Sequence, residues 1–226
     1  MTFFERLMQE TKSDRDAFQS ISLIQTAVCQ GVDKDLYVAF LTQAYHHVKF
    51  TCPLLGAALS RVGQNDGLFR TALIEYIDEE KGHEEWILDD IEAFGGDRKM
   101  VVNQAPNISI NVMCGYAFYA IEHVSPYALL GMVHVLEGMS VALATQAAGA
   151  IFERLQLGDG AKGFSYLRSH GSLDVEHTDF FEDLVNKIED ASVQDTIIAS
   201  AKIFYCLYGD IFRELETQSI EAQHAA

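Results

Sequence analysis

The sequence is poor in the residue that most often interrupts helices. Only 3 of its 226 residues are proline, which a helix interior tolerates least because proline has no N–H group to donate. Apolar residues recur three and four positions apart over long stretches, and no segment shows a convincing alternation of the kind that marks a half-buried strand. We therefore expect an all-α protein.

Positive charge is also scarce. Sixteen lysines and arginines against 33 aspartates and glutamates leave a formal net charge of −17. This charge repels phosphate groups, so we expect the chain to bind neither nucleic acid nor an anionic membrane surface. The four cysteines lie far apart without a CxxC pair, which is typical of reduced core thiols. Together with the early charges of the N-terminal segment, they indicate a cytoplasmic protein.

The spacing of apolar residues predicts where the helices lie. Pro53 predicts a kink near Thr51, and Gly95 with Gly96 predicts the end of a helix before the longest loop, GDRKMVVNQAP. No linker separates two halves of different composition, so we expect residues 1–226 to form one domain, a bundle of about seven or eight helices. The expected helices cover residues 2–12, 16–30, 34–63, 66–94, 107–123, 126–156, 159–169, 172–188 and 192–217.

One predicted helix carries a single charge in an apolar setting. The segment 126–152 is apolar over more than twenty residues, but polar residues interrupt it and no basic residue flanks it closely enough to suggest a membrane anchor. We interpret it as a buried core helix. Glu137 is its only residue that is charged at neutral pH. An ionised carboxylate in an apolar core must be protonated, paired or bound to a cation. Because basic residues are scarce, we expect a metal ion, with His134 as a neutral neighbour.

A second stretch, LIEYIDEEKGHEEWILDDI, combines acids with one histidine. Glu80 and His83 stand three residues apart, and on one helix they would share a face. Di-iron carboxylate bundles use this Glu-x-x-His spacing to offer a carboxylate and an imidazole together. A solvated acidic face is the alternative interpretation, and Glu79 and Glu84 compete with Glu80 as the ligand.

The third stretch is HGSLDVEHTDFF, residues 170–181. A helix turns by about 100° per residue, so His170, Asp174 and His177 would fall within about 60° of one another. Imidazole and carboxylate are ligands that suit iron, manganese or zinc. Chance also produces this spacing on acidic surfaces, and Gly171 could end a helix there, which would leave His170 just before the next one.

The three stretches together supply carboxylates and imidazoles for two divalent ions. The absence of thiolates from the set argues against a structural zinc site. Open coordination positions would remain for dioxygen and a substrate. The six candidate metal ligands, which are also the candidate catalytic residues, are Glu80, His83, Glu137, His170, Asp174 and His177.

Other aromatic and imidazole side chains allow two interpretations. Tyr45, His46 and His47 lie within one predicted helix. They are either a pocket wall and proton donor, or a core tyrosine with a surface histidine. Tyr205 and Tyr208 on the last predicted helix are typical of packing residues.

The order of three motifs, EEKGHEEWILDDI, then VLEGMS, then HGSLDVEHTDFF, resembles the haem-oxygenase-like di-metal oxidases. Their superfamily also holds TenA-type thiaminases and PqqC-type cofactor oxidases. The resemblance runs from LYVAFLTQAYHHVKF to the last helix. It implies a seven-helix bundle with a buried pocket, in which the six residues above bind a labile di-iron centre that activates O₂. Family members differ in the position of the first carboxylate, here Glu80.

The resemblance implies an enzyme, an O₂-dependent non-haem di-iron oxidase or oxygenase that acts on a small organic substrate. Its cofactors would be two iron ions, with manganese as the alternative metal and O₂ as co-substrate. The expected assembly is a homodimer. Two alternatives stay open: a metal-free thiaminase-type hydrolase or cofactor-biosynthesis oxidase, and a non-catalytic helical binding protein. A thiaminase would need a cysteine on the predicted helix that contains VLEGMS. That helix has none, and Cys114 lies on the preceding predicted helix.

Overall fold

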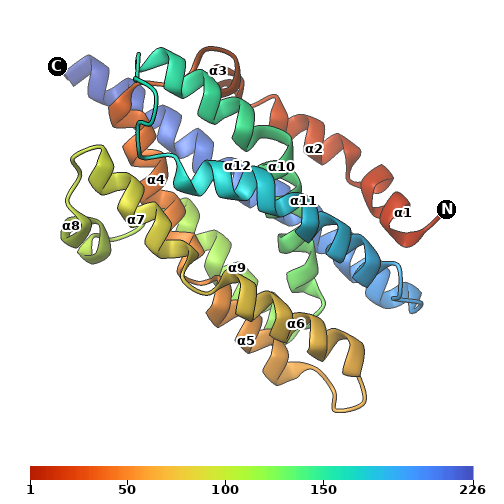
Figure 1. Cartoon of the computed structure of the whole chain (residues 1–226). Coiled ribbons are helices and arrows are strands. Elements are labelled where there is room, and N and C mark those ends of the chain that lie inside the picture. Colours follow the sequence, from red (N-terminus) through yellow and green to blue (C-terminus); the bar gives the residue numbers. More distant parts are fainter. Residues whose placement is uncertain (226) are drawn as a thin grey trace.

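The computed structural model describes residues 1–225, apart from the side chains of residues 170–177 and 225. The described residues contain helices and no strand, which confirms the all-α fold. The helices are α1 (Phe3–Glu10), α2 (Lys12–Gln19), α3 (Ser22–Gln30), α4 (Lys34–Val48), α5 (Thr51–Arg61), α6 (Gly67–Glu80), α7 (His83–Ala93), α8 (Arg98–Asn103), α9 (Ile108–His123), α10 (Ala128–Arg154), α11 (Ser165–Val185) and α12 (Ala191–Ala225) (Figure 1).

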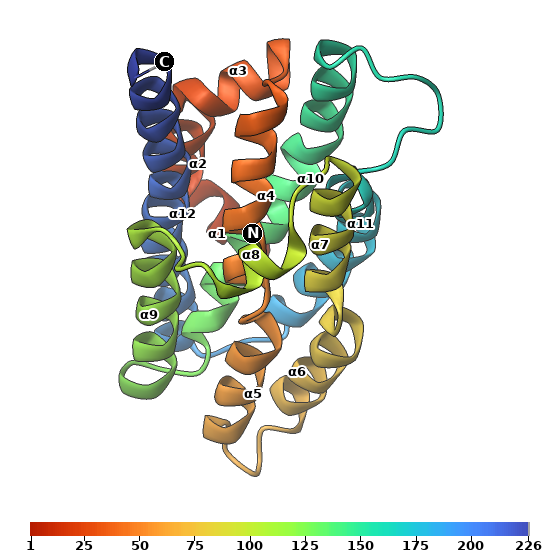
Figure 2. The same ribbon diagram turned by 90° about the vertical axis from the view of Figure 1, so that its left-hand side faces the viewer.

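Helix α10 lies at the centre of the bundle. It packs against α3, α9, α11 and α12, and α9 lies beside α12 (Figure 2). By length and composition alone, α10 could cross a membrane. Half of its most apolar 18-residue stretch is buried inside the bundle. A helix that is apolar on most sides needs partners on most sides, and these four neighbours supply them. The interpretation of 126–152 as a core helix agrees with this packing.

The crossing of α10 and α12 depends on a glycine. A Cβ atom at Gly131 would lie 2.5 Å from the backbone nitrogen of Ala201 and 2.7 Å from Cβ of Ser200. The Ser200 hydroxyl donates a hydrogen bond of 2.6 Å to the carbonyl oxygen of Ala128. The two longest helices therefore approach at backbone distance.

Several predicted helices are divided in the structure, so seven or eight was too low a number. The kink expected near Thr51 is a full break at Lys49 and Phe50, which places Pro53 in the first turn of α5, where its missing N–H group is not needed. The helix predicted over 66–94 ends at Glu80 and restarts at His83, because Gly82 adopts a left-handed φ of 90°. The prediction of one helix there was wrong.

Three other boundaries differ from the expected ones. The segment 16–30 breaks between α2 and α3, and the long loop after Gly96 contains α8, whose first turn is capped by the Asp97 carboxylate. The two helices predicted over 159–169 and 172–188 are a single helix, α11, which runs through Gly171. Glycine costs a helix interior only about 1 kcal/mol, a cost that packing against α10 can offset.

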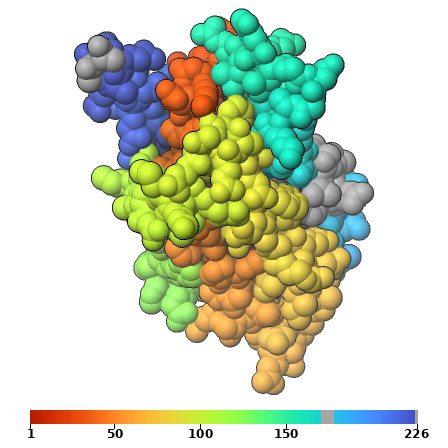
Figure 3. Space-filling view, turned by 60° about the vertical axis from the view of Figure 1, so that its left-hand side comes forward, coloured from red at the N-terminus to blue at the C-terminus, as the bar shows by residue number. Residues whose placement is uncertain are grey.

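The N-terminus of α11 is held by a buried carboxylate on α7. Asp90 is 1% exposed, and its two oxygens accept from the backbone N–H groups of Ser165 (2.9 Å) and Tyr166 (2.8 Å). Burial raises the pKa of Asp90, and these hydrogen bonds oppose the rise. In Figure 3 the segment that leads into α11 (cyan) lies beside α7 (yellow). Asp90 therefore fixes the start of the helix that carries the predicted His-Asp-His triplet.

We expect Asp90→Asn to lower the free energy of unfolding by about 1–3 kcal/mol, because the amide nitrogen would face a buried N–H group that has lost its acceptor. Urea denaturation followed by circular dichroism measures the change. Asp89→Asn is the matched control, since Asp89 is exposed and pairs at 3.2 Å with Arg98 on the surface, a contact worth at most about 1 kcal/mol. Equal denaturation midpoints for the two variants would contradict this role.

Candidate metal and substrate site

A cavity of about 80 Å³ lies between α4, α5, α6, α10, α11 and α12. Leucine, valine and methionine side chains form most of its wall. The polar lining residues are His47, Thr51, Tyr76, Glu80, Glu137, Ser140, Tyr166 and Tyr208. Two of the predicted metal ligands, Glu80 and Glu137, thus face the same enclosed space from different helices.

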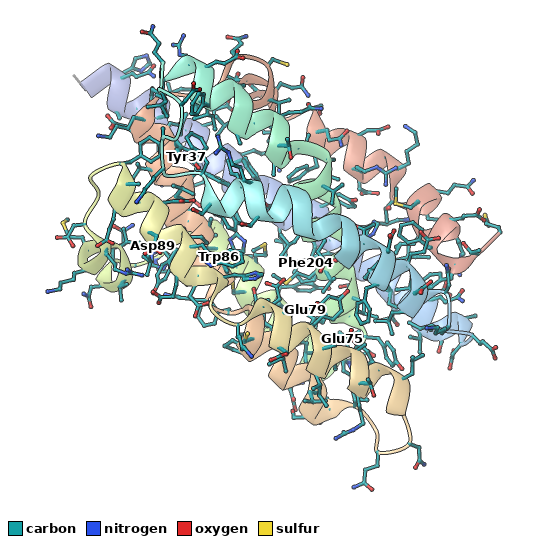
Figure 4. The ribbon with its side chains drawn as sticks, viewed as in Figure 1. Tyr37, Glu75, Glu79, Trp86, Asp89 and Phe204 are labelled. Carbon is teal, nitrogen blue, oxygen red and sulfur yellow. The ribbon has the colours of Figure 1, made fainter. Side chains whose placement is uncertain are left out.

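Glu80 and His83 lie together at the junction of α6 and α7. Oε2 of Glu80 is 3.1 Å from Nδ1 of His83, and the two side chains are only 12% and 6% exposed. Trp86, labelled in Figure 4, stacks on the His83 ring with centroids 4.1 Å apart. The predicted proximity is confirmed, but its cause is different, because the turn at Gly82 and not a shared helix face brings the pair together.

The structure also separates the competing acids. Glu79, labelled in Figure 4 near the end of α6, is exposed, and Glu84 is half-buried on α7. Neither lines the cavity, whereas Glu80 lines it and contacts His83. Glu80 is therefore the acid of this stretch that is placed to act with Glu137.

Glu137 lies on α10 between two cavities. It lines the 80 Å³ cavity on one side and, on the other, a cavity of about 190 Å³ shared with His134 and with Phe4, Met8 and Thr178. Burial raises the pKa of Tyr76, and the charges of Glu137, Glu79 and Glu80 raise it further. The field of these acids therefore reaches the Tyr76 hydroxyl.

The side chains of His170, Asp174 and His177 lie outside the described residues, so their convergence stays a prediction. Helix α11 is continuous across these positions and packs against α10, α7 and α6. These are the helices that carry the other three predicted ligands. Among the residues whose side chains are described, no group of three or more histidines, cysteines and acids is arranged to hold a metal ion.

His134 contacts two hydroxyl groups beside Glu137. Its Nε2 atom lies 3.4 Å from Thr11 Oγ1 and 3.4 Å from the Tyr205 hydroxyl. Burial, followed by the charge of Arg15, lowers its pKa to about 4. His134 is therefore neutral at physiological pH, as expected from the sequence.

The other histidines and tyrosines named from the sequence lie either at the cavity wall or in the core. His47 lines the cavity and its Nδ1 lies 3.3 Å from the carbonyl oxygen of Gln43. His46 is fully buried and not on the surface, and burial with the charge of Lys49 lowers its pKa to about 4. Tyr208 stacks on Phe18, as expected of a packing residue, and also lines the cavity.

Sequence reasoning missed two tyrosines of the cavity and the clamp at Asp90. Tyr76 is 2% exposed and stands one helical turn before Glu80, and Tyr166 follows the N-terminus of α11. The four-residue spacing of Tyr76 and Glu80 is a signal that could have placed them on one face. For Tyr166 the sequence holds no such signal, because the loop before α11 sets its position.

The architecture defines the class of protein to which the chain belongs. A domain with a haem-oxygenase-like fold from Shewanella denitrificans superposes with a TM-score of 0.88 at 19% identity, over 99% of this chain and 96% of that one. A TenA homologue from Pseudomonas syringae pv. tomato gives 0.79 at 11% identity, over 95% and 93%. A haem oxygenase from Leptospira interrogans gives 0.74 at 18% identity, over 95% and 100%. The fold is therefore haem-oxygenase-like.

The family follows from the sequence itself. Residues 38–209 match the family described as iron-containing redox enzyme, and the chain belongs to that family. No curated protein matches the chain in sequence. This match confirms the predicted family resemblance.

Acid should destabilise the protein partly through His134. The unfolded chain takes up a proton at this residue near pH 6.5, whereas the folded chain does so only near pH 4. The stability that this residue contributes is therefore present above pH 6.5 and is lost as the pH falls toward 4. We expect wild type to lose about 1–2 kcal/mol more than His134→Gln between pH 7 and 5. Urea denaturation at both pH values measures this difference.

The exposed His123 supplies the matched control, and His123→Gln should keep the wild-type pH dependence. If His134→Gln also keeps it, His134 does not carry the effect.

Proposed function

We propose that the chain is an O₂-dependent non-haem di-iron oxidase or oxygenase that acts on a small organic substrate in the 80 Å³ cavity. One observation carries the proposal: Glu80 and Glu137 share an otherwise mostly apolar cavity, and His83 lies 3.1 Å from Glu80. Membership of a family described as iron-containing redox enzymes supports the same conclusion. His170, Asp174 and His177 on α11 would complete the set.

The donor set fits two divalent ions of the first transition series. Carboxylate oxygens and imidazole nitrogens suit ferrous iron or manganese. The described lining of the cavity contains two acids and neither lysine nor arginine, so a cation would offset charge that is costly in an apolar space. The six residues named above would hold the ions, which supply the activation of O₂ and the oxidising power when bound.

The protein's own groups would orient the ligands and exclude water. The contact with Glu80 and the stacked ring of Trp86 would orient the His83 imidazole. Leu54, Leu129 and Met132 give the cavity apolar walls that keep bulk water from the acids. Tyr76 keeps its proton, since burial and the neighbouring acids raise its pKa.

The size of the cavity favours a small substrate. Pockets for drug-sized ligands commonly measure about 300–1,000 Å³, whereas this cavity measures about 80 Å³. A group as large as haem would require the bundle to open, so the likeness in fold to haem oxygenases does not carry their cofactor to this chain.

A cysteine-dependent reaction is less well supported. Cys114 is buried on α9, and burial raises its pKa to about 11, which leaves it as a neutral thiol. Only the thiolate is an effective nucleophile. The described cavities are lined by no cysteine, which supports the oxidase over a thiaminase-type hydrolase.

We expect about two ferrous ions per chain after anaerobic loading and removal of excess metal, as measured by elemental analysis. Glu80→Gln should lose at least one ion because it removes the carboxylate in the cavity, while Glu79→Gln should keep both. The His170→Ala, His177→Ala double variant should lose both, with an unchanged circular dichroism spectrum. Fewer than one iron per wild-type chain, or unchanged binding by the double variant, would sink the proposal.

A further inference from the structure

The Tyr76 hydroxyl is a buried donor that the described protein does not satisfy. Tyr76 is 2% exposed and lines the 80 Å³ cavity, and its hydroxyl oxygen has no hydrogen-bond partner among the described residues. Leaving such a group unpaired is destabilising, and folded proteins rarely do so. The hydroxyl therefore points to a group that enters the cavity from outside the chain.

The surroundings of Tyr76 limit the chemistry of the group that can bind there. Burial, followed by the charges of the neighbouring acids, raises the pKa of Tyr76. The hydroxyl therefore keeps its proton and offers a donor, and an incoming molecule must offer an acceptor. Neither lysine nor arginine is present in the described lining. Most of the remaining wall is apolar, and a charged group is costly to place against such a wall, so an uncharged acceptor is favoured.

A second cavity with mostly apolar walls adjoins the first one. It also measures about 80 Å³, and the two cavities share Ser140, Tyr166 and Tyr208. Beyond these residues its wall is apolar, with Leu143 and Ala147 on α10 facing residues of α2, α3, α4 and α12. The two cavities adjoin at the three shared residues, and we term the second cavity the apolar arm beyond Ser140.

We propose that Tyr76 donates a hydrogen bond to the acceptor oxygen of a small, uncharged, mostly apolar ligand, such as a ketone or ester, whose body extends into the apolar arm. This assignment names a substrate class for the proposed function. That the ligand reacts rests on the proposed function, whereas the binding of the ligand does not. A cavity of about 150 Å³ with apolar walls binds benzene in another protein, so the combined space suits a ligand of that size.

A matched pair of ligands tests the hydrogen bond. Acetophenone carries a carbonyl acceptor, and ethylbenzene has nearly the same shape without one. We expect calorimetric titration of the full-length chain to show that Tyr76→Phe weakens acetophenone about fivefold to tenfold, the usual strength of one hydrogen bond, and changes ethylbenzene less than twofold. Tyr116→Phe, which removes a hydroxyl that lines none of the described cavities, should leave both affinities unchanged.

The apolar arm has its own variant. Ala147→Phe should fill the arm and weaken both ligands at least tenfold, while Ala150→Phe, on the same helix but outside both cavities, should not. Equal weakening of the two ligands by Tyr76→Phe, or no binding of either ligand to wild type, would overturn the assignment.

Counting iron in the same samples separates this assignment from the proposed function. Two irons per chain without ligand binding would overturn only the ligand class. Ligand binding that depends on Tyr76 in a chain that never holds iron would support the ligand class and overturn the oxidase.

Discussion

The arrangement of the candidate site depends on one half-buried carboxylate within an apolar helix. Glu137 is the only charged residue of α10 between Ala128 and Phe152. The apolar length of α10 demands neighbours on most sides, and those neighbours enclose the carboxylate between two cavities. Enclosed charge must be offset. The chain brings a second acid, Glu80, and the His83 imidazole to the same region, and the described lining of the cavity contains no lysine or arginine. This lining supports the cation site that we propose over an ion pair.

The rest of the fold holds this arrangement in place. Gly131 lets α12 approach α10 at backbone distance, and Asp90 fixes the N-terminus of α11 against α7. Helix α11 therefore lies beside each of the helices that carry Glu80, His83 and Glu137. The neutral His134 adds a polar side chain near Glu137 without adding charge. The close approach at Gly131, the cap at Asp90 and the contacts of His134 thus position the helices around the two acids.

The sequence predicts those features that depend on local spacing. The all-α fold and the central helix follow from periodicity and residue type, whereas the closeness of Glu80 and His83 was predicted from a shared helix face and arises instead from the turn at Gly82. The break at Gly82 and the continuity of α11 through Gly171 could not be predicted, because a glycine ends one helix and is tolerated in another according to tertiary packing. The buried hydroxyl of Tyr76 is likewise a property of the assembled cavity. The homodimer and the cytoplasmic location stay predictions.

The central claim is that six side chains from α6, α7, α10 and α11 hold two iron ions. Anomalous diffraction at the iron edge, from crystals loaded with Fe(II) without oxygen, tests it most directly. The account predicts two iron peaks, each bounded by carboxylates and imidazoles from the set Glu80, His83, Glu137, His170, Asp174 and His177. Loaded crystals that show no iron peak beside Glu137, or that bind iron only at surface acids, would contradict it.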